Sequence, residues 1–205
     1  MNELPTVYLV DDDLAVRDSL GLLIEQEGYA VECYASAEAF LDAELADGPG
    51  CLVLDLRMPG MDGIRLQDEL RRRSLDLPIV FLSGHGDIPT SVRAIKAGAV
   101  DFLTKPVTGD ALLHCVETAV AESRRRRIAA AANHNAASRL ATLTEREREV
   151  MALAVTGLAN KEIARMLGIS HRTVEIHKAR LMQKTGAETV LDLVRLADAS
   201  NGAAP

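Results

Sequence analysis

Short apolar segments that end in polar residues alternate, in the first half of this 205-residue chain, with segments of helical spacing. The clearest is Cys51-Leu52-Val53-Leu54, which has the length and composition of a buried parallel strand and runs directly into Asp55-Leu56-Arg57-Met58-Pro59-Gly60-Met61-Asp62-Gly63. Further strands are predicted at residues 7–10, 79–82 and 101–104. Strands that alternate with helices require right-handed crossovers, which predicts a doubly wound α/β sheet.

Carboxylates follow two of these predicted strands. The first strand ends in Asp11-Asp12-Asp13, and the strand at 51–54 ends in Asp55. The carboxyl ends of strands are where ligands bind in open α/β sheets, and carboxylates that meet there need a cation. Oxygen ligands alone suit Mg²⁺, and no Cys/His cluster with zinc spacing competes. Asp11, Asp12 and Asp55 are therefore candidate metal ligands, whereas Asp13 and Asp62 taken singly are predicted turn or helix caps.

A hydroxyl and an ammonium are expected at the same edge, because the strand at 79–82 runs into Ser83 and the strand at 101–104 into Lys105. An aspartate can attack phosphorus and form an aspartyl-phosphate when a metal and a cation neutralise the transferred group. Mg²⁺ and Lys105 suit those roles, and Ser83 suits a hydrogen bond to a phosphoryl oxygen. The peptide bond between Lys105 and Pro106 is a candidate for the cis form.

Five residues together resemble the receiver domain of bacterial two-component response regulators over residues 6–121: Asp11, Asp12, Asp55, Ser83 and Lys105. The resemblance implies a flavodoxin-like fold of five βα repeats and a phosphoryl transfer to Asp55 from the phosphohistidine of a sensor histidine kinase. It implies that Asp12 and Asp55, with the backbone carbonyl of Arg57, hold Mg²⁺, and that Asp11 supports them mainly through water.

The same resemblance implies a switch. Ser83 and Lys105 would contact the phosphoryl group, and Phe102 occupies the place of the switch aromatic. On phosphorylation Ser83 is expected to move toward the phosphoryl group while Phe102 turns inward. The face formed by residues 92–96 and Phe102 would then form a homodimer.

Charge divides the chain into an acidic and a basic half. Residues 1–121 contain 9 Lys and Arg against 21 Asp and Glu, net −12, whereas residues 122–205 contain 14 against 9, net +5. A basic half indicates that this part of the chain binds a polyanion. We predict a receiver at 1–121, an alanine-rich and helical linker at 122–139, and a second domain at 140–205. The four arginines at 124–127 are interpreted as a solvated helix end in preference to a phosphate-binding patch.

The second half shows the pattern of a helix-turn-helix. Thr144-Glu145-Arg146-Glu147 has the form of a capping box, and Asn160 is predicted to cap a short helix. Gly168-Ile169-Ser170 makes a turn before a longer helix at 172–184, which would lie in the major groove. A last apolar helix at 188–197 would pack on the other three or pair with another subunit, so an all-α tetrahelical domain is predicted.

Residues 139–198 resemble the LuxR/NarL-type DNA-binding domain, through Leu143-Thr144-Glu145-Arg146-Glu147, Asn160-Lys161-Glu162-Ile163-Ala164 and Thr173-Val174-Glu175-Ile176-His177. The two resemblances together point to the NarL/FixJ class of transcription regulators, and within it to the nitrogen-fixation members. They imply promoter DNA and RNA polymerase as partners and activation of nitrogen-fixation genes. A regulator of the same architecture that controls other genes is the alternative.

On the predicted recognition helix, Val174 and Leu181 should face the core. Phosphate contacts are expected from Lys161, Thr173, His177, Lys178 and Arg180, and contacts nearer the bases from Arg172, Glu175, Ile176 and Ala179. Glu175 stands where other members of the family have Lys. It either accepts a hydrogen bond from a cytosine amino group or faces away.

Two rival functions use part of the same pattern. A Mg²⁺-dependent phosphohydrolase would also carry an aspartate nucleophile, but it needs no helix-turn-helix, so we expect a regulator and not an enzyme. A regulator whose second domain binds protein is the other rival.

The three cysteines, Cys33, Cys51 and Cys115, have no metal spacing and are predicted to be reduced core residues of a cytoplasmic protein. Neither export nor a membrane anchor is expected.

Overall fold

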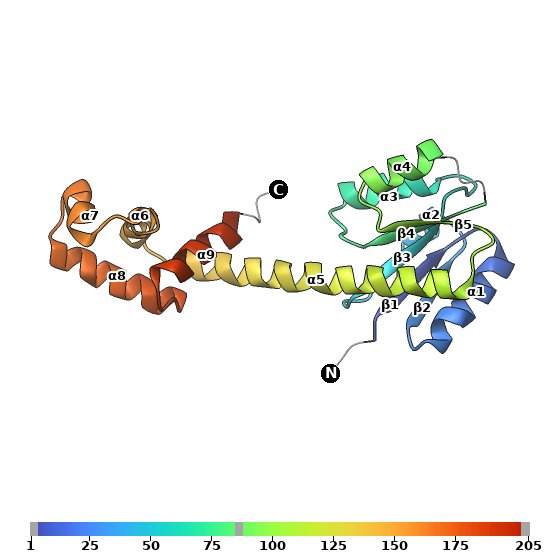
Figure 1. The fold of residues 1–205 in the computed structure, drawn as a ribbon, viewed down its shortest axis with the longest axis horizontal. Helices are drawn as coiled ribbons and strands as arrows, with labels where there is room; N and C mark the ends of the chain where they lie inside the picture. Colours follow the sequence, from blue (N-terminus) through green and yellow to red (C-terminus); the bar gives the residue numbers. More distant parts are fainter. Residues whose placement is uncertain (1–3, 85–87, 202–205) are drawn as a thin grey trace. The chain divides into compact units, whose positions relative to one another are not determined.

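The computed structural model describes residues 4–84 and 88–201, and it divides into two compact units, Met1–Arg127 and Ile128–Pro205 (Figure 1). The division falls inside one helix, α5 (Gly109–Ala141). Each unit is described by itself.

The first unit is built on a five-stranded parallel sheet in the order β2-β1-β3-β4-β5. Its strands are β1 (Thr6–Val10), β2 (Ala30–Tyr34), β3 (Gly50–Asp55), β4 (Ile79–Ser83) and β5 (Asp101–Thr104). The four strands predicted from apolar runs are confirmed, and β2 is an edge strand that the sequence analysis did not locate. This order, with a helix after each strand, is the predicted doubly wound fold.

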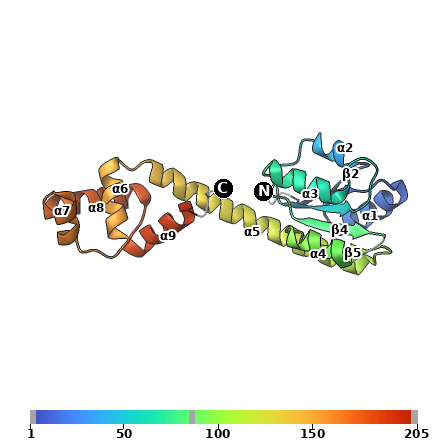
Figure 2. The same ribbon diagram turned by 90° about the horizontal axis from the view of Figure 1, so that it is seen from above.

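Helices cover both faces of the sheet (Figures 1 and 2). One apolar core joins the sheet to α1 (Leu14–Gln26) and α5, and the other joins it to α2 (Ala37–Leu41), α3 (Gly63–Arg72) and α4 (Ile88–Lys96). Successive strand residues alternate between these cores, as Leu9 and Val10 do in β1, because side chains of a strand point to opposite faces.

Two short polar side chains begin the helices that follow the candidate site. Asp13 Oδ1 accepts a hydrogen bond from Ala15 N–H at 2.8 Å at the start of α1. Asp62 Oδ1 accepts one from Arg65 N–H at 2.8 Å at the start of α3. Both aspartates are N-caps, as predicted, and each fixes where the loop after a strand turns into a helix.

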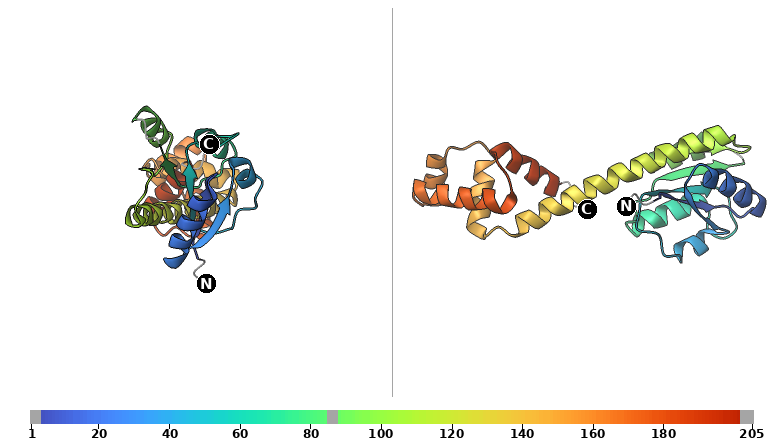
Figure 3. Two further views of the ribbon diagram at one scale, coloured as in Figure 1. Left: turned by 90° about the vertical axis from the view of Figure 1, so that its right-hand side faces the viewer. Right: turned by 90° about the horizontal axis from the view of Figure 1, so that it is seen from below.

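The second unit contains α6 (Glu145–Ala154), α7 (Asn160–Leu167), α8 (His171–Thr185) and α9 (Val190–Asn201), shown in Figure 3. Its core includes the fully buried side chains of Val150, Ile163, Val174, Leu181 and Leu193. The capping box at the start of α6 is confirmed. Gly168 ends α7 in the left-handed conformation with φ +65°, which favours glycine and makes the turn of a helix-turn-helix.

Three predictions from the sequence are wrong. Asn160 is the first residue of α7 and not its cap, which is Ala159. Cys51 and Cys115 are buried, but Cys33 is exposed because it lies on the edge strand β2. The arginines at 124–127 are not a helix end, since α5 continues through them to Ala141.

Two of those arginines form ion pairs with loops of the first unit. Arg126 pairs with Glu122 and Asp76, and Arg127 Nη2 lies 2.7 Å from Asp47 Oδ1. One turn earlier, Ser123 Oγ accepts a hydrogen bond from Gly50 N–H at 3.2 Å, at the start of β3. These contacts hold this part of α5 against the first unit, which argues against a free phosphate-binding patch.

Candidate functional site

The register of the sheet brings two carboxylates side by side. β1 and β3 pair with Val10 opposite Leu54, so Asp11 and Asp55 come next to each other at the carboxyl ends of neighbouring strands. Ser83 ends β4, the strand on the other side of β3, and pairs with Thr104 of β5. Parallel strands in register therefore bring Asp11, Asp55, Ser83 and Lys105 to one edge, while Phe102 lies within β5, opposite Phe81.

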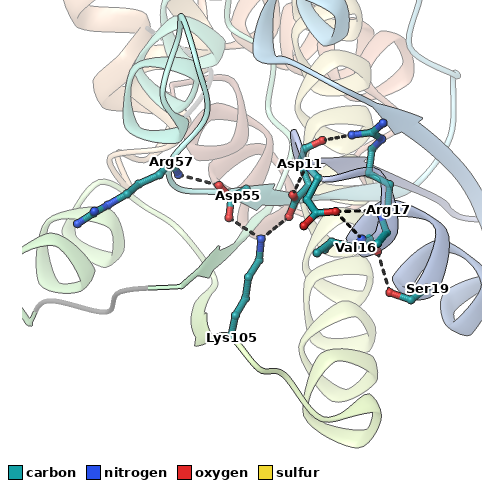
Figure 4. A network of polar contacts seen from close by, with 9 residues as sticks. Asp11, Val16, Arg17, Ser19, Asp55, Arg57 and Lys105 are labelled. Carbon is teal, nitrogen blue, oxygen red and sulfur yellow. Dashed lines mark hydrogen bonds and ion pairs between the residues drawn. The ribbon is translucent and has the colours of Figure 1, made fainter.

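Lys105 lies between the two carboxylates (Figure 4). Its Nζ is 2.5 Å from Asp11 Oδ2 and 2.8 Å from Asp55 Oδ1. Asp11 is fully buried and Asp55 is 5% exposed, so neither charge is well solvated. One ammonium thus pairs with two buried carboxylates. The site therefore keeps a net negative charge that attracts a further cation.

The remaining oxygens of the two carboxylates are oriented by the backbone. Asp11 Oδ1 accepts from Asp13 N–H at 3.0 Å, and Asp55 Oδ2 accepts from Arg57 N–H at 2.9 Å. Arg17, which the sequence analysis did not single out, donates from Nη1 to the Asp11 carbonyl at 2.6 Å. It lies one turn into α1 and helps to hold the loop that carries Asp11 (Figure 4).

The site shifts two pKa values. Burial raises the pKa of Asp55, while the hydrogen bond from Lys105 opposes the rise and the nearby Asp11 charge adds to it. Burial also disfavours the charge on Lys105, but hydrogen bonds to Asp11 and Asp55 outweigh it and raise the pKa of the ammonium. Lys105 therefore stays a cation over the whole neutral range.

The metal ligands stay a prediction. Among residues 4–84 and 88–201 no three acidic, His or Cys side chains are arranged to hold a metal ion, since Lys105 Nζ stands between Asp11 and Asp55 and Asp12 is exposed. The donor chemistry nevertheless fits a hard divalent cation, because every available ligand is an oxygen and the pair carries excess negative charge. Such an ion keeps several waters and needs few protein ligands.

The predicted switch residues lie on β4 and β5. Ser83 is buried, and its carbonyl accepts the Lys105 N–H at 2.7 Å, which ties the two strand ends together. Phe102 is half-buried with its ring centroid 6.3 Å from that of Phe81. The bond between Lys105 and Pro106 is cis, as predicted.

The second unit presents α8 as its candidate DNA-binding helix. Val174 and Leu181 are fully buried, as predicted, and the other side of the helix is open. The candidate contact residues that are exposed are Lys161, Arg172, Glu175, Ile176, Ala179 and Arg180, while Thr173, His177 and Lys178 are half-buried.

Three of these polar residues already have partners. Lys178 Nζ donates to Asn160 Oδ1 at 3.3 Å, and Thr173 Oγ1 lies 2.7 Å from Ser170 Oγ, the cap of α8. Glu175 Oε1 lies 3.6 Å from His171 Nδ1, on the exposed side of the helix. Lys178 thereby links the two helices of the helix-turn-helix.

Both units match known families. Residues 7–117 match the response regulator receiver domain, and residues 141–197 match the luxR family of bacterial regulatory proteins. The transcriptional regulatory protein FixJ of Bradyrhizobium diazoefficiens is 44% identical over 191 residues, which are 93% of each chain. The response regulator protein TodT of Pseudomonas putida is 40% identical over 192 residues, 94% of this chain and 85% of TodT.

Solved structures of response regulators are similar to this chain over nearly its whole length. The structure of the response regulator StyR has a TM-score of 0.84 and 43% identity, and covers 96% of this chain and 99% of StyR. Full-length FixJ from B. japonicum has a TM-score of 0.58 and 42% identity, with 98% of both chains covered.

The fold and the paired carboxylates therefore define a receiver domain. The chain belongs to the two-component response regulators that join a receiver to a LuxR-type DNA-binding domain. It is a transcription regulator that works with a sensor histidine kinase and promoter DNA. In the described part of the chain, every helix is too short or too polar to cross a membrane.

Proposed function

We propose that Asp55 is the phosphoacceptor and that its phosphorylation turns on dimerisation and promoter binding. The observation that carries the proposal is the contact of Lys105 Nζ with Asp55 Oδ1 at 2.8 Å, inside a pair of buried carboxylates. A nucleophilic carboxylate needs a cation close by to neutralise an incoming phosphoryl group, and Lys105 meets that need.

In the proposed reaction a carboxylate oxygen of Asp55 bonds to phosphorus while the bond from phosphorus to the kinase imidazole nitrogen breaks. The imidazole leaves with the electron pair of that bond, and the product is an acyl phosphate on Asp55. The backbone N–H of Arg57, 2.9 Å from Asp55 Oδ2, holds the carboxylate in orientation. Lys105 and Ser83 are the proposed contacts of the phosphoryl oxygens.

The proposed metal ligands are Asp11, Asp12, Asp55 and the backbone carbonyl of Arg57. A bound Mg²⁺ would supply charge neutralisation on the transferred group. Asp12 is exposed next to the buried Asp11, so its carboxylate is free to turn toward a cation without loss of packing.

The switch is proposed to run from Ser83 to Phe102 and then to the face formed by residues 92–96 with Phe102. Phosphorylation adds roughly 1.5 to 2 negative charges at Asp55. A shift from about 1:99 inactive to 99:1 active requires roughly 5.5 kcal/mol of preference for the active state, which several charge-assisted hydrogen bonds can supply. Val92 and Ile95 are exposed and apolar, which suits a surface that becomes buried in a homodimer.

A dimer would place two α8 helices one DNA turn apart in successive major grooves, with RNA polymerase as the further partner. Relatives with different target genes are equally similar to this chain. Relatives of comparable identity include the nitrogen-fixation regulator FixJ and a C4-dicarboxylate transport regulator, DctR of Rhodobacter capsulatus, 44% identical over 194 residues. Activation of nitrogen-fixation genes is one proposal, and control of other genes by the same architecture is the alternative.

The test of the phosphoacceptor is phosphoryl incorporation from acetyl phosphate with Mg²⁺, followed by intact-mass spectrometry. We expect one hydroxylamine-labile phosphoryl group per chain, none on Asp55→Asn, and an unchanged level on Asp68→Asn, which alters an exposed carboxylate of α3. Chelation of divalent ions should slow incorporation at least about tenfold. Equal incorporation on Asp55→Asn would overturn the assignment.

A further inference from the structure

Side chains of α3 hold the C-terminal turn of α4. After Lys96 the chain turns through Gly98, with φ +93°, and Ala99 N–H donates back to Ala94 O at 3.1 Å. Ala94 O thus has a backbone donor, while Ala97 is the first residue after α4, at a helix end whose last carbonyls need partners from outside the helix.

Between them, Gln67 and Arg71 of α3 donate to the carbonyls of Ala94 and Ala97. Gln67 Nε2 donates to Ala94 O and Ala97 O, at 3.3 Å each, and the Arg71 guanidinium also donates to Ala97 O. We refer to these contacts as the α4 clamp. A cavity of about 450 Å³ lined in part by Gln67, Arg71 and Ala97 lies beside it. The end of α4 is therefore held by these hydrogen bonds in addition to the packing of Ala94 and Ala99 in the apolar core.

The buried amide of Gln67 lowers the stability of the fold. The residue is 4% exposed, and its Oε1 is buried without a hydrogen-bond partner among the described residues. A buried acceptor that lacks a donor costs stability, and an apolar side chain of equal size would avoid that cost. What the amide contributes here is the pair of directional bonds to α4.

The other end of α3 is seated on the phosphoacceptor strand. Gly63 N–H donates to Leu56 O at 3.0 Å, and a Cβ at Gly63 would lie 2.5 Å from the Asp55 carbonyl oxygen. There is no room for α3 to approach Asp55 more closely. Gln67 lies one turn further along α3, so its position relative to Asp55 is fixed by the contact of Gly63 with the Asp55 backbone.

We propose that Gln67 is a positioning residue of the phosphorylation switch. It anchors the C-terminal turn of α4 relative to Asp55, so that the response to phosphorylation is confined to the other end of α4, which follows Ser83 in the chain. Val92, an exposed apolar residue of α4 outside the clamped turn, then changes orientation by a pivot about a fixed end, while the exposed Ile95 lies within the clamped turn. This inference rests on the proposed phosphorylation of Asp55.

The test compares wild type, Gln67→Met and the exposed control Asp68→Asn by amide hydrogen exchange, each with and without acetyl phosphate and Mg²⁺. In the donor-free proteins we expect exchange at the amides of residues 97–99 to rise at least tenfold in Gln67→Met and to stay within twofold in Asp68→Asn. Gln67→Met removes both donors at nearly constant volume, so the fold is kept.

The second readout separates a positioning role from a structural one. With equal phosphoryl incorporation, the donor-dependent change in exchange should lie in the N-terminal half of α4 in wild type and spread over all of α4 in Gln67→Met. Unchanged exchange at 97–99 without donor overturns the inference, as does a response to donor in Gln67→Met that is the same as in wild type. If wild type takes up no phosphoryl group at Asp55, the proposed function fails, whereas the clamp itself is still judged from the donor-free exchange.

Discussion

The ammonium of Lys105 lies 2.8 Å from Asp55 Oδ1, and the same ammonium lies 2.5 Å from the fully buried Asp11. One cation from the end of β5 is therefore shared by carboxylates at the ends of β1 and β3. An incoming phosphoryl group would compete with Asp11 for this cation, which gives the site a direct means of sensing whether Asp55 is modified.

Replacement of Lys105 should separate modification from response. Lys105→Met leaves two buried carboxylates facing each other, and one of them is expected to take up a proton, so we predict a loss of about 3 kcal/mol or less in the free energy of unfolding. The protein should still fold, but acetyl phosphate should no longer change its oligomeric state. Urea denaturation and sedimentation, with Arg65→Met as the control for loss of an exposed cation, check both parts; a donor response equal to that of wild type would refute the role.

Asp55→Asn should stabilise the protein at neutral pH. Burial raises the pKa of Asp55, so the folded state binds its proton more tightly than the unfolded chain does. The resulting penalty is absent below the unfolded pKa and is complete above the folded pKa. We expect a midpoint of thermal unfolding about 2–5 °C above that of wild type at pH 7.5, and a difference that shrinks as the pH falls through the folded pKa.

The matched control for that experiment is Asp13→Asn, because Asn caps a helix as well as Asp and residue 13 is exposed. It should leave the midpoint nearly unchanged at every pH. A lower midpoint for Asp55→Asn at pH 7.5 would mean that the ion pair with Lys105 outweighs the cost of burial.

The basic residues of the second unit should appear in the salt dependence of DNA binding. Lys161 is exposed near the start of α7, and we expect Lys161→Met to weaken specific and non-specific duplex binding about equally. The slope of log affinity against log salt should fall by about 1. Arg195→Met, an exposed cation on α9, serves as the control and should keep the slope. Fluorescence anisotropy at several salt concentrations measures it, and an unchanged slope for Lys161→Met would remove Lys161 from the phosphate contacts.

The stability of the DNA-binding unit should depend on Lys184. Lys184 Nζ lies 2.7 Å from Glu147 Oε2, and this hydrogen bond, with that from Thr144 N–H, lowers the pKa of Glu147 to about 2. A lowered pKa means that the stabilisation is present above the unfolded value of about 4.5 and is lost as the pH falls toward 2. The difference in unfolding free energy between wild type and Lys184→Met should be constant near pH 7 and should shrink between about pH 4.5 and 2. A pH-independent difference would show that the charge of Glu147 plays no part.

The carboxylate edge could be predicted because its residues follow unbroken apolar runs, and such runs end where a parallel strand leaves the core. β2 could not be found in the same way. Ala30-Val31-Glu32-Cys33-Tyr34 is a half-buried edge strand that carries a charge in its middle. For the same reason Cys33 is exposed, although its apolar neighbours indicated a core position.

Other contacts depend on pairs that only the fold brings together. Arg126 and Arg127 find Asp76 and Asp47 in separate loops, and no local pattern links these residues. Gln67 did leave a signal, since it shares the buried face of α3 with Gly63, Leu66 and Leu70 at helical spacing. A polar residue on that face indicates a buried hydrogen-bonding role, although its partners in α4 could not be read from the sequence.

The most direct test of the account is sedimentation velocity of wild type and Asp55→Asn, with and without acetyl phosphate and Mg²⁺. We predict a donor-dependent shift of wild type from monomer to dimer and no shift of Asp55→Asn. A wild-type protein that takes up a phosphoryl group at Asp55 and keeps its mass would contradict dimerisation as the output of the switch.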